Sequence, residues 1–135
     1  ICLDSTPCIF IEMMRSVCRP AETLYRQSAA EFKREPLTKI SSVKGHQDIM
    51  DAVRLAPSGV NNQSWFFTGD DGTIHAYSER SMITDRMNRI NVGIALNHMY
   101  LAAMHFGKQV QILPPGQVEA EKLKKYDHVA SMKLN

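Results

Sequence analysis

The sequence has no long hydrophobic run and no excess of one charge. No apolar stretch reaches the roughly 20 residues that a membrane-spanning helix needs, which excludes a transmembrane protein. Lys and Arg total 16 and Asp and Glu total 14, and both signs are spread evenly along the chain. Without a basic lobe, the electrostatic case for nucleic-acid binding is weak. With 44% hydrophobic and 22% charged residues, the composition is that of an ordinary globular protein.

Cysteine is also scarce, since the chain of 135 residues has three, at Cys2, Cys8 and Cys18. Their odd number and the lack of C-x2-C spacing favour reduced thiols over a zinc site, with a stray disulfide as the weaker alternative. The chain starts with Ile1 and lacks the basic start and uninterrupted apolar segment of a signal peptide. We therefore expect a cytoplasmic protein, and a sequence that is a piece of a longer one.

Hydrophobic periodicity predicts two helices and a hairpin in the middle of the chain. Between residues 49 and 56, apolar residues recur at i, i+3, i+4 and i+7, which indicates a helix with Asp48 as its N-cap. Two β-prone runs around the Gly-Asp-Asp-Gly turn at 69–72 predict a β-hairpin. The segment 92–106 is apolar on nearly every side, which predicts a long helix that is either central and buried or shared with a partner.

The two ends of the chain carry shorter signals. We expect a strand at 109–113, a short charged helix at 119–126 and a last strand at 128–134. Near the N-terminus, a strand at 7–11 and a helix over 20–32 are predicted. Strands and helices intermix without a regular βαβ series, so the predicted fold class is α+β.

The most informative segment is A-P-S-G-V-N-N-Q-S-W at 56–65. Pro57 ends the predicted helix, and together with Gly59 it lets the backbone approach a flat ligand closely. Ser58, Asn61 and Gln63 supply uncharged donors and acceptors, which suit the edge of a heteroaromatic ring. By themselves these residues favour a simpler alternative, a helix–loop–strand connection whose polar side chains satisfy turn backbone.

The same segment resembles the A-P-S-x-x-N-x-Q-P-W signature of the nitroreductase-like, FMN-dependent oxidoreductases. The run R-I-N-V-G-I-A-L-N-H at 89–98 is similar to the long central helix of that superfamily. More narrowly, an ordered set of features resembles the second lobe of nitroreductases that carry two lobes in one chain. The set comprises K-R-x-P-L, the loop motif, the hairpin, the helix and a closing Y-D-H-V-A-S-M-K. On this resemblance, residues 1–32 are the tail of a first lobe and residues 33–135 form the second.

The resemblance implies a fold, a cofactor and an activity. The fold would be a sheet flanked by helices with a long central helix, incomplete without the first lobe. The activity would be hydride transfer from NAD(P)H through bound FMN to a nitroaromatic or quinone acceptor. If the FMN-lining role of the family motif is carried over residue by residue, the residues that line the FMN are Pro57, Ser58, Asn61 and Gln63. The missing N-terminal lobe or a homodimer partner would complete the protein, and no catalytic residue or metal ligand is nominated.

Three departures from the family pattern affect this interpretation. Ser64 stands where the signature has Pro, and Asn91 stands where the helix motif has Asp. The arginines that bind the FMN phosphate in the first lobe have no counterpart before Lys33, and Glu35 is unfavourable for phosphate. The chain alone is therefore expected to bind FMN poorly or not at all. Two alternatives stay open: a non-catalytic flavin- or nucleotide-binding protein, and an α+β module that dimerises through its long helix without a ligand.

Two further pairs of residues, one of arginines and one of histidines, are candidate sites. Arg86 and Arg89 lie just ahead of the helix expected from residue 92, where an anion site is a minor alternative to a solvated loop. His98 and His105 share a helix face, but no third ligand accompanies them. We therefore expect these histidines to pack rather than to bind a metal.

Overall fold

The computed structural model describes residues 28–135. The strand expected at 7–11, most of the helix expected at 20–32 and the three cysteines lie outside the described residues. The chain divides into two compact units, Ile1–Lys33 and Arg34–Asn135. In the described part of the first unit, the 3-10 turn η2 (Ala29–Glu31) is followed by an extended residue. The assignment of residues 1–32 to a preceding lobe stays a prediction.

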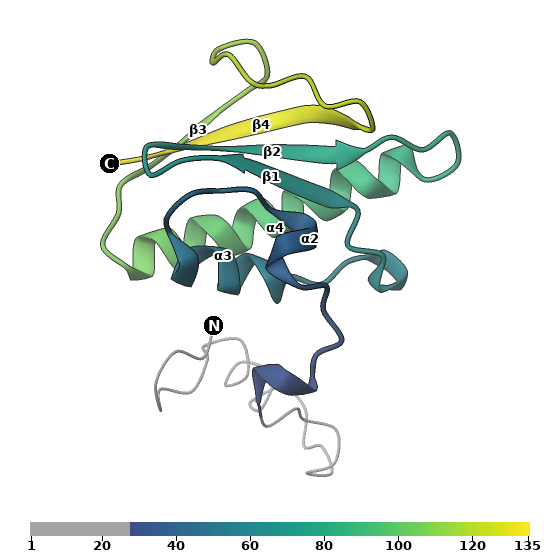
Figure 1. The fold of residues 1–135 in the computed structure, drawn as a ribbon, viewed down its shortest axis with the longest axis horizontal. Helices are drawn as coiled ribbons and strands as arrows, with labels where there is room; N and C mark the ends of the chain where they lie inside the picture. The colour runs from purple at the N-terminus through teal and green to yellow at the C-terminus, as the bar shows by residue number, and fades with distance from the viewer. Residues whose placement is uncertain (1–27) are drawn as a thin grey trace. The chain divides into compact units, whose positions relative to one another are not determined.

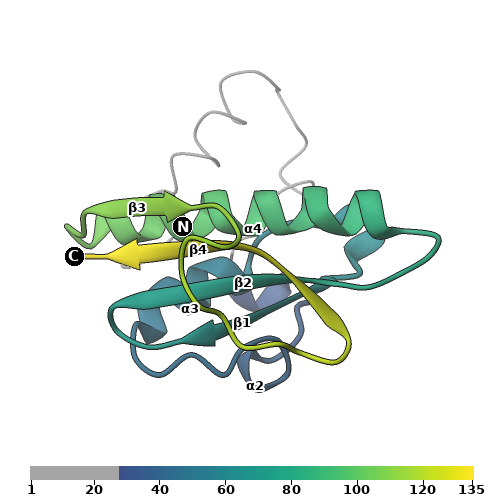
Figure 2. The ribbon, with the colours of Figure 1, turned by 90° about the horizontal axis from the view of Figure 1, so that it is seen from above.

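A four-stranded antiparallel sheet forms one layer of the second unit, with strand order β1-β2-β4-β3 (Figure 2). The strands are β1 (Trp65–Gly69), β2 (Thr73–Glu79), β3 (Val110–Leu113) and β4 (Tyr126–Leu134). β1 and β2 are the predicted hairpin, and the strands predicted near the C-terminus are β3 and β4. The Asp70 carboxylate closes the hairpin turn, because its Oδ1 accepts the backbone N–H of Gly72 at 3.0 Å.

The free edge of β1 is partly covered by the segment that follows α2 (Leu37–Ile40). Ser41 forms a parallel bridge with Phe67, and the backbone N–H of Lys44 donates to the Gly69 carbonyl at 3.0 Å. An exposed edge strand would offer its unpaired backbone groups to other chains. The backbone of this segment therefore satisfies part of the β1 edge.

The helices α3 (Gln47–Arg54) and α4 (Asp85–His105) lie together against one face of the sheet (Figure 1). The predicted apolar face is confirmed, since three of its members are buried in α3 and the fourth, Ala56, is buried just after the helix. The predicted N-cap is wrong: His46, with φ of 48°, precedes the helix, and Asp48 lies in its first turn. The His46 ring explains the shift, because its Nε2 lies 2.7 Å from the Asp71 carbonyl oxygen and anchors the helix start to the hairpin.

α4 begins at Asp85, earlier than predicted, so Arg86 and Arg89 lie inside the helix rather than ahead of it. Arg89 Nε pairs with Asp85 Oδ2 at 2.9 Å, one turn away. Of the two alternatives predicted for α4, complete burial within the chain is wrong, because Ile90 and Met104 on its outer face are 59% and 54% exposed. That the helix is shared with a partner stays a prediction. The helix ends as expected before Gly107, which adopts a left-handed φ of 72°.

The predicted helix at 119–126 does not form. The chain instead runs as an open connection between β3 and β4, over the sheet face away from α3 and α4 (Figure 1). Side chains from β2 and from the residue after it hydrogen-bond to two carbonyl groups of this segment. The Tyr77 hydroxyl donates to the Glu121 carbonyl at 3.0 Å, and Arg80 Nη1 donates to the Lys124 carbonyl at 3.1 Å. These long-range hydrogen bonds outcompete a short helix of charged residues.

The core lies between the sheet and the two helices. Its fully buried side chains include Trp65, Phe67, Ile74, Val53, Ile49, Val92 and Met99. Within the part of the chain that is described, no helix is both long and apolar enough to cross a membrane. The α+β architecture predicted for this unit is confirmed.

Candidate functional site

The loop that joins α3 to β1 has an unusual backbone. Three of its residues other than glycine adopt a left-handed φ: Val60 at 47°, Asn61 at 57° and Gln63 at 48°. This conformation is rare for any residue with a side chain and is a true outlier for a β-branched one. Val60 is also 89% exposed, so packing of its side chain does not compensate the cost. The surroundings must hold the loop, which includes the 3-10 turn η3 (Gly59–Asn61).

Two of the four predicted FMN-lining residues hold this loop from within. Ser58 Oγ accepts the backbone N–H of Gln63 at 2.9 Å, which closes the loop on itself. Gln63 is 8% exposed, and both ends of its amide are occupied. Its Oε1 accepts the Glu35 backbone N–H at 2.8 Å, and its Nε2 donates to the Asn61 carbonyl at 3.3 Å. The other two predicted residues, Pro57 and Asn61, are exposed on the surface of the loop.

Arg34 is one residue that the sequence prediction left out of the site. Its Nε and Nη2 both donate to the Leu55 carbonyl, at 3.3 and 3.2 Å, and its Nη1 donates to Asn61 Oδ1 at 2.6 Å. The structure thus brings the K-R-x-P-L segment beside the loop motif, across 27 residues of sequence. The signal that could have found Arg34 was present, because the same short segment carries part of the family resemblance.

Asn91 contacts the loop from α4, which the sequence did not predict. It is 2% exposed, and its Oδ1 accepts the Gly59 backbone N–H at 2.9 Å. Its Nδ2 donates to Asn62 Oδ1 at 3.0 Å and to Ser64 Oγ at 3.3 Å. Gly59 also packs against Met87, since a Cβ at Gly59 would lie 2.5 Å from the Met87 Sδ. The two departures from the family motif, at positions 64 and 91, are therefore in direct contact.

The arrangement offers neutral hydrogen-bonding groups and one nearby cation. Such a surface suits a flat, polar, uncharged ring whose edge presents both C=O and N–H groups. Among residues 28–135, no group of three or more His, Cys, Asp or Glu side chains is placed to hold a metal ion. His98 Nδ1 lies 3.4 Å from the Ala52 carbonyl oxygen, which places this ring in the contact between α3 and α4.

A second polar cluster lies on the other face of the sheet, because residues at successive strand positions point to opposite faces. His75 Nδ1 and His128 Nε2 lie 2.7 and 2.9 Å from the same hydroxyl oxygen, Ser131 Oγ. Burial lowers the pKa of His128 below its ordinary value, and the neighbouring His75 lowers it further. Burial also lowers the pKa of His98.

These histidines predict a fall in stability on mild acidification. Unfolded histidine takes up a proton near pH 6.5, whereas His98 and His128 in the folded chain resist protonation to lower pH. Stability is fully present above that pH and is lost as the pH falls toward the lowered folded pKa values. The melting temperature, measured from about pH 8 to about pH 5, should fall by a few degrees.

The His128→Gln variant is expected to show a shallower dependence of melting temperature on pH than the original chain. The exposed His105 at the end of α4 offers the matched control, and His105→Gln should keep the original slope. Equal slopes for all three proteins would contradict the assignment of this dependence to His128.

Comparison with known proteins decides the family. Residues 10–103 match the family model described as "Putative TM nitroreductase". The chain belongs to this nitroreductase family. The resemblance inferred from the loop motif and the long helix is therefore confirmed, whereas the FMN-lining role of the four loop residues stays a prediction.

A solved structure supports the nitroreductase fold. The chain is similar to a crystal structure described as a putative nitroreductase from Thermotoga maritima, with 26% sequence identity and a TM-score of 0.52. The match covers 77% of this chain and 43% of that protein. This nitroreductase-family chain therefore spans less than half the length of the neighbour. No match is found among curated proteins.

Proposed function

We propose that this chain is part of an FMN-dependent NAD(P)H oxidoreductase that reduces nitroaromatic or quinone-type acceptors in the cytoplasm. One observation carries the proposal: the family's loop motif adopts a strained backbone that Ser58 and Gln63 hold in place, next to the Arg34 guanidinium. Strained backbone kept by surrounding hydrogen bonds is characteristic of binding sites. Family membership supports the same conclusion.

The donor set of the loop fits a flavin. The ring edge of FMN presents C=O and N–H groups, which neutral amide and backbone groups can match without placing a charge in the site. In this arrangement Pro57 and Asn61, which are exposed, would contact the ring. Ser58 and Gln63 would hold the loop behind them, and Arg34 would orient the Asn61 amide. Bound FMN would supply the hydride chemistry, and the chain would supply position and electrostatics.

We further propose that a second lobe completes the site. The chain spans 43% of the similar nitroreductase, and the outer face of α4 leaves Ile90, Leu101 and Met104 at 59%, 41% and 54% exposure. An apolar helix face of this kind is typical of an interface. The N-terminal lobe of the same protein is the favoured partner, and a second copy of the chain is the alternative.

A flavin-retention experiment tests the proposal. The chain, alone and extended by the N-terminal part of its gene product, is mixed with FMN, desalted and examined by visible absorption. We expect the extended protein to stay yellow and to bleach when NADH or NADPH is added without oxygen. A colourless extended protein would overturn the proposal. Retained colour that neither nicotinamide bleaches would favour a non-catalytic flavin-binding protein instead.

A further inference from the structure

Four hydrogen bonds run in series from the loop to the end of β2. The Gly59 backbone N–H donates to Asn91 Oδ1 at 2.9 Å, and Asn91 Nδ2 donates to Asn62 Oδ1 at 3.0 Å. Asn62 Nδ2 then donates to Asn88 Oδ1 at 3.2 Å, and Asn88 Nδ2 donates to the Glu79 carbonyl at 2.9 Å. Three side-chain amides are thus connected head to tail between two backbone groups. We call this series the amide relay.

The direction of the amide relay is set by its two ends. A backbone N–H only donates and a backbone C=O only accepts, so the first amide must present oxygen to Gly59 and the last must present nitrogen to Glu79. Each amide in between therefore has one possible orientation. Asn88 and Asn91 are each 2% exposed, so water has little access to replace a missing partner at these two positions, whereas Asn62 between them is exposed.

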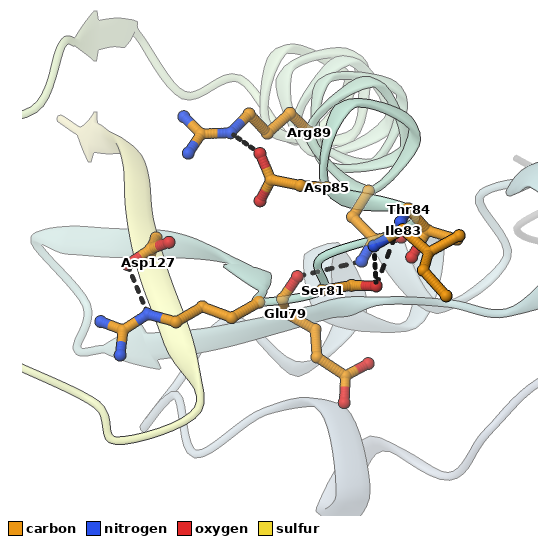
Figure 3. A network of polar contacts seen from close by, with 9 residues as sticks. Glu79, Ser81, Ile83, Thr84, Asp85, Arg89 and Asp127 are labelled. Atoms are coloured by element: carbon orange, nitrogen blue, oxygen red, sulfur yellow. Dashed lines mark hydrogen bonds and ion pairs between the residues drawn. The ribbon is translucent and has the colours of Figure 1, made fainter.

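The relay ends on a firmly held part of the fold. The Glu79 backbone N–H donates to the Ser64 carbonyl at 3.0 Å, which ties the end of β2 to the start of β1. In the turn that follows, Ser81 Oγ accepts the backbone N–H groups of Ile83 and Thr84 at 3.3 and 3.1 Å (Figure 3). The loop that carries the left-handed residues is therefore connected to a braced strand end and to the first turns of α4.

We infer that Asn62, Asn88 and Asn91 are positioning residues for the ligand loop, and that they act only as a one-directional relay of neutral amides. Each position needs one acceptor and one donor at the same time. A carboxylate of identical size offers two acceptors and breaks the series. That the positioned ligand is FMN rests on the proposed function, whereas the holding of the loop does not.

Replacing Asn91 by Asp keeps the shape and removes the donor. One carboxylate oxygen still accepts from Gly59, but the other faces the Asn62 Oδ1 oxygen. Turning the Asn62 and Asn88 amides over moves the mismatch to the Glu79 carbonyl without removing it. The Ser64 hydroxyl can donate to the new carboxylate, but the contact between oxygens remains. Only a proton on the carboxyl restores the relay, so the pKa of the introduced group rises above that of an ordinary Asp.

This gives a pH signature that loss of packing would not produce. Since the folded variant binds a proton more tightly than the unfolded one, its stability falls as the pH rises from about 4 through the raised folded pKa. Relative to the original chain, Asn91→Asp should melt roughly 10 °C lower at about pH 8 and only a few degrees lower at about pH 4.5. Asn97→Asp is the matched control, because Asn97 is exposed on α4 outside the relay. The difference in melting temperature between Asn97→Asp and the original chain should not grow with pH.

A second readout measures the loop itself on the FMN-free chain. Amide hydrogen exchange over residues 59–63 should be roughly 10-fold faster in Asn91→Asp at about pH 8 and close to the original rate at about pH 4.5. If Asn91→Asp fails to fold at neutral pH, Asn62→Asp, whose side chain is exposed, breaks the same relay at the loop. Equal pH profiles and equal loop exchange for relay variants and Asn97→Asp would overturn the inference.

FMN titration separates this inference from the proposed function. If the original protein binds FMN, Asn91→Asp should bind it roughly 10-fold more weakly at about pH 8, with recovery at lower pH. If the original protein, extended by its N-terminal part, binds no FMN while the pH signature and loop exchange appear as expected, the proposed function fails and the relay stands. FMN binding that is equal in all variants would overturn the positioning role.

Discussion

Replacing Gln63 by Ala is expected to weaken FMN binding by roughly 10–100-fold. The substitution removes two hydrogen bonds: Gln63 Oε1 accepts the Glu35 backbone N–H at 2.8 Å, and Gln63 Nε2 donates to the Asn61 carbonyl at 3.3 Å. Both hydrogen bonds are partly buried, and a net hydrogen bond of this kind contributes about 0.5–1.5 kcal/mol. Because the loop backbone is already strained at Gln63, the cost should appear as loss of the binding conformation.

A titration of FMN fluorescence against the protein extended by its N-terminal lobe measures this effect. Gln63→Glu is the conservative variant, since it keeps an acceptor for the Glu35 N–H and loses only the donor to Asn61. Its affinity for FMN should lie between that of the original protein and that of Gln63→Ala. The exposed Gln117 in the β3–β4 connection provides a control, and Gln117→Ala should bind FMN normally. If Gln63→Ala binds FMN as tightly as this control, Gln63 has no part in the site.

Replacing Phe67 by Ala is expected to lower the free energy of unfolding by about 3–5 kcal/mol. Phe67 is fully buried at the centre of β1, where its backbone also pairs with the edge segment at Ser41 and Ser42. Removing its ring deletes buried apolar surface and leaves a cavity that the sheet and helices fill only in part. Since domains of this size are stable by only about 5–15 kcal/mol, the loss is a large share of the total.

Urea unfolding followed by circular dichroism measures this change, with Phe106→Ala as the control. Phe106 is 39% exposed after α4, so its replacement should cost much less. If Phe67→Ala does not fold, Phe67→Leu keeps most of the volume and should cost under about 1.5 kcal/mol. Costs for Phe67→Ala and Phe106→Ala that agree within about 1 kcal/mol would contradict the position of Phe67 in the core.

Local sequence patterns correctly predicted those helices and strands whose formation depends on residues close together in the sequence. The hairpin follows from two β-prone runs around a turn whose Asp70 side chain caps its own backbone. The buried face of α3 follows from the i, i+3, i+4, i+7 spacing, which is a property of any helix. The family resemblance followed from residue types in the loop motif and was confirmed.

The errors arose where distant contacts override local preference. Periodicity placed the start of α4 too late because Asn88 and Asn91 are polar, yet both are buried by the loop that they bind. The charged run at 119–126 has the composition of a helix, but Tyr77 and Arg80 hydrogen-bond to the carbonyl groups of Glu121 and Lys124. In both cases the deciding partner lies far away in the sequence, where a local pattern does not reach.

The sequence by itself determined the fold class, the family and the chemical character of the candidate site, since these depend on residue types and short spacings. The tertiary structure decided which of those residues work together. Arg34 meets Asn61 across 27 residues, and Gly59 meets Asn91 across 32. The physical reason is that an amide satisfies its donor and its acceptor only where folding places the partners. The order of the relay is therefore a property of the folded backbone rather than of any segment of the chain.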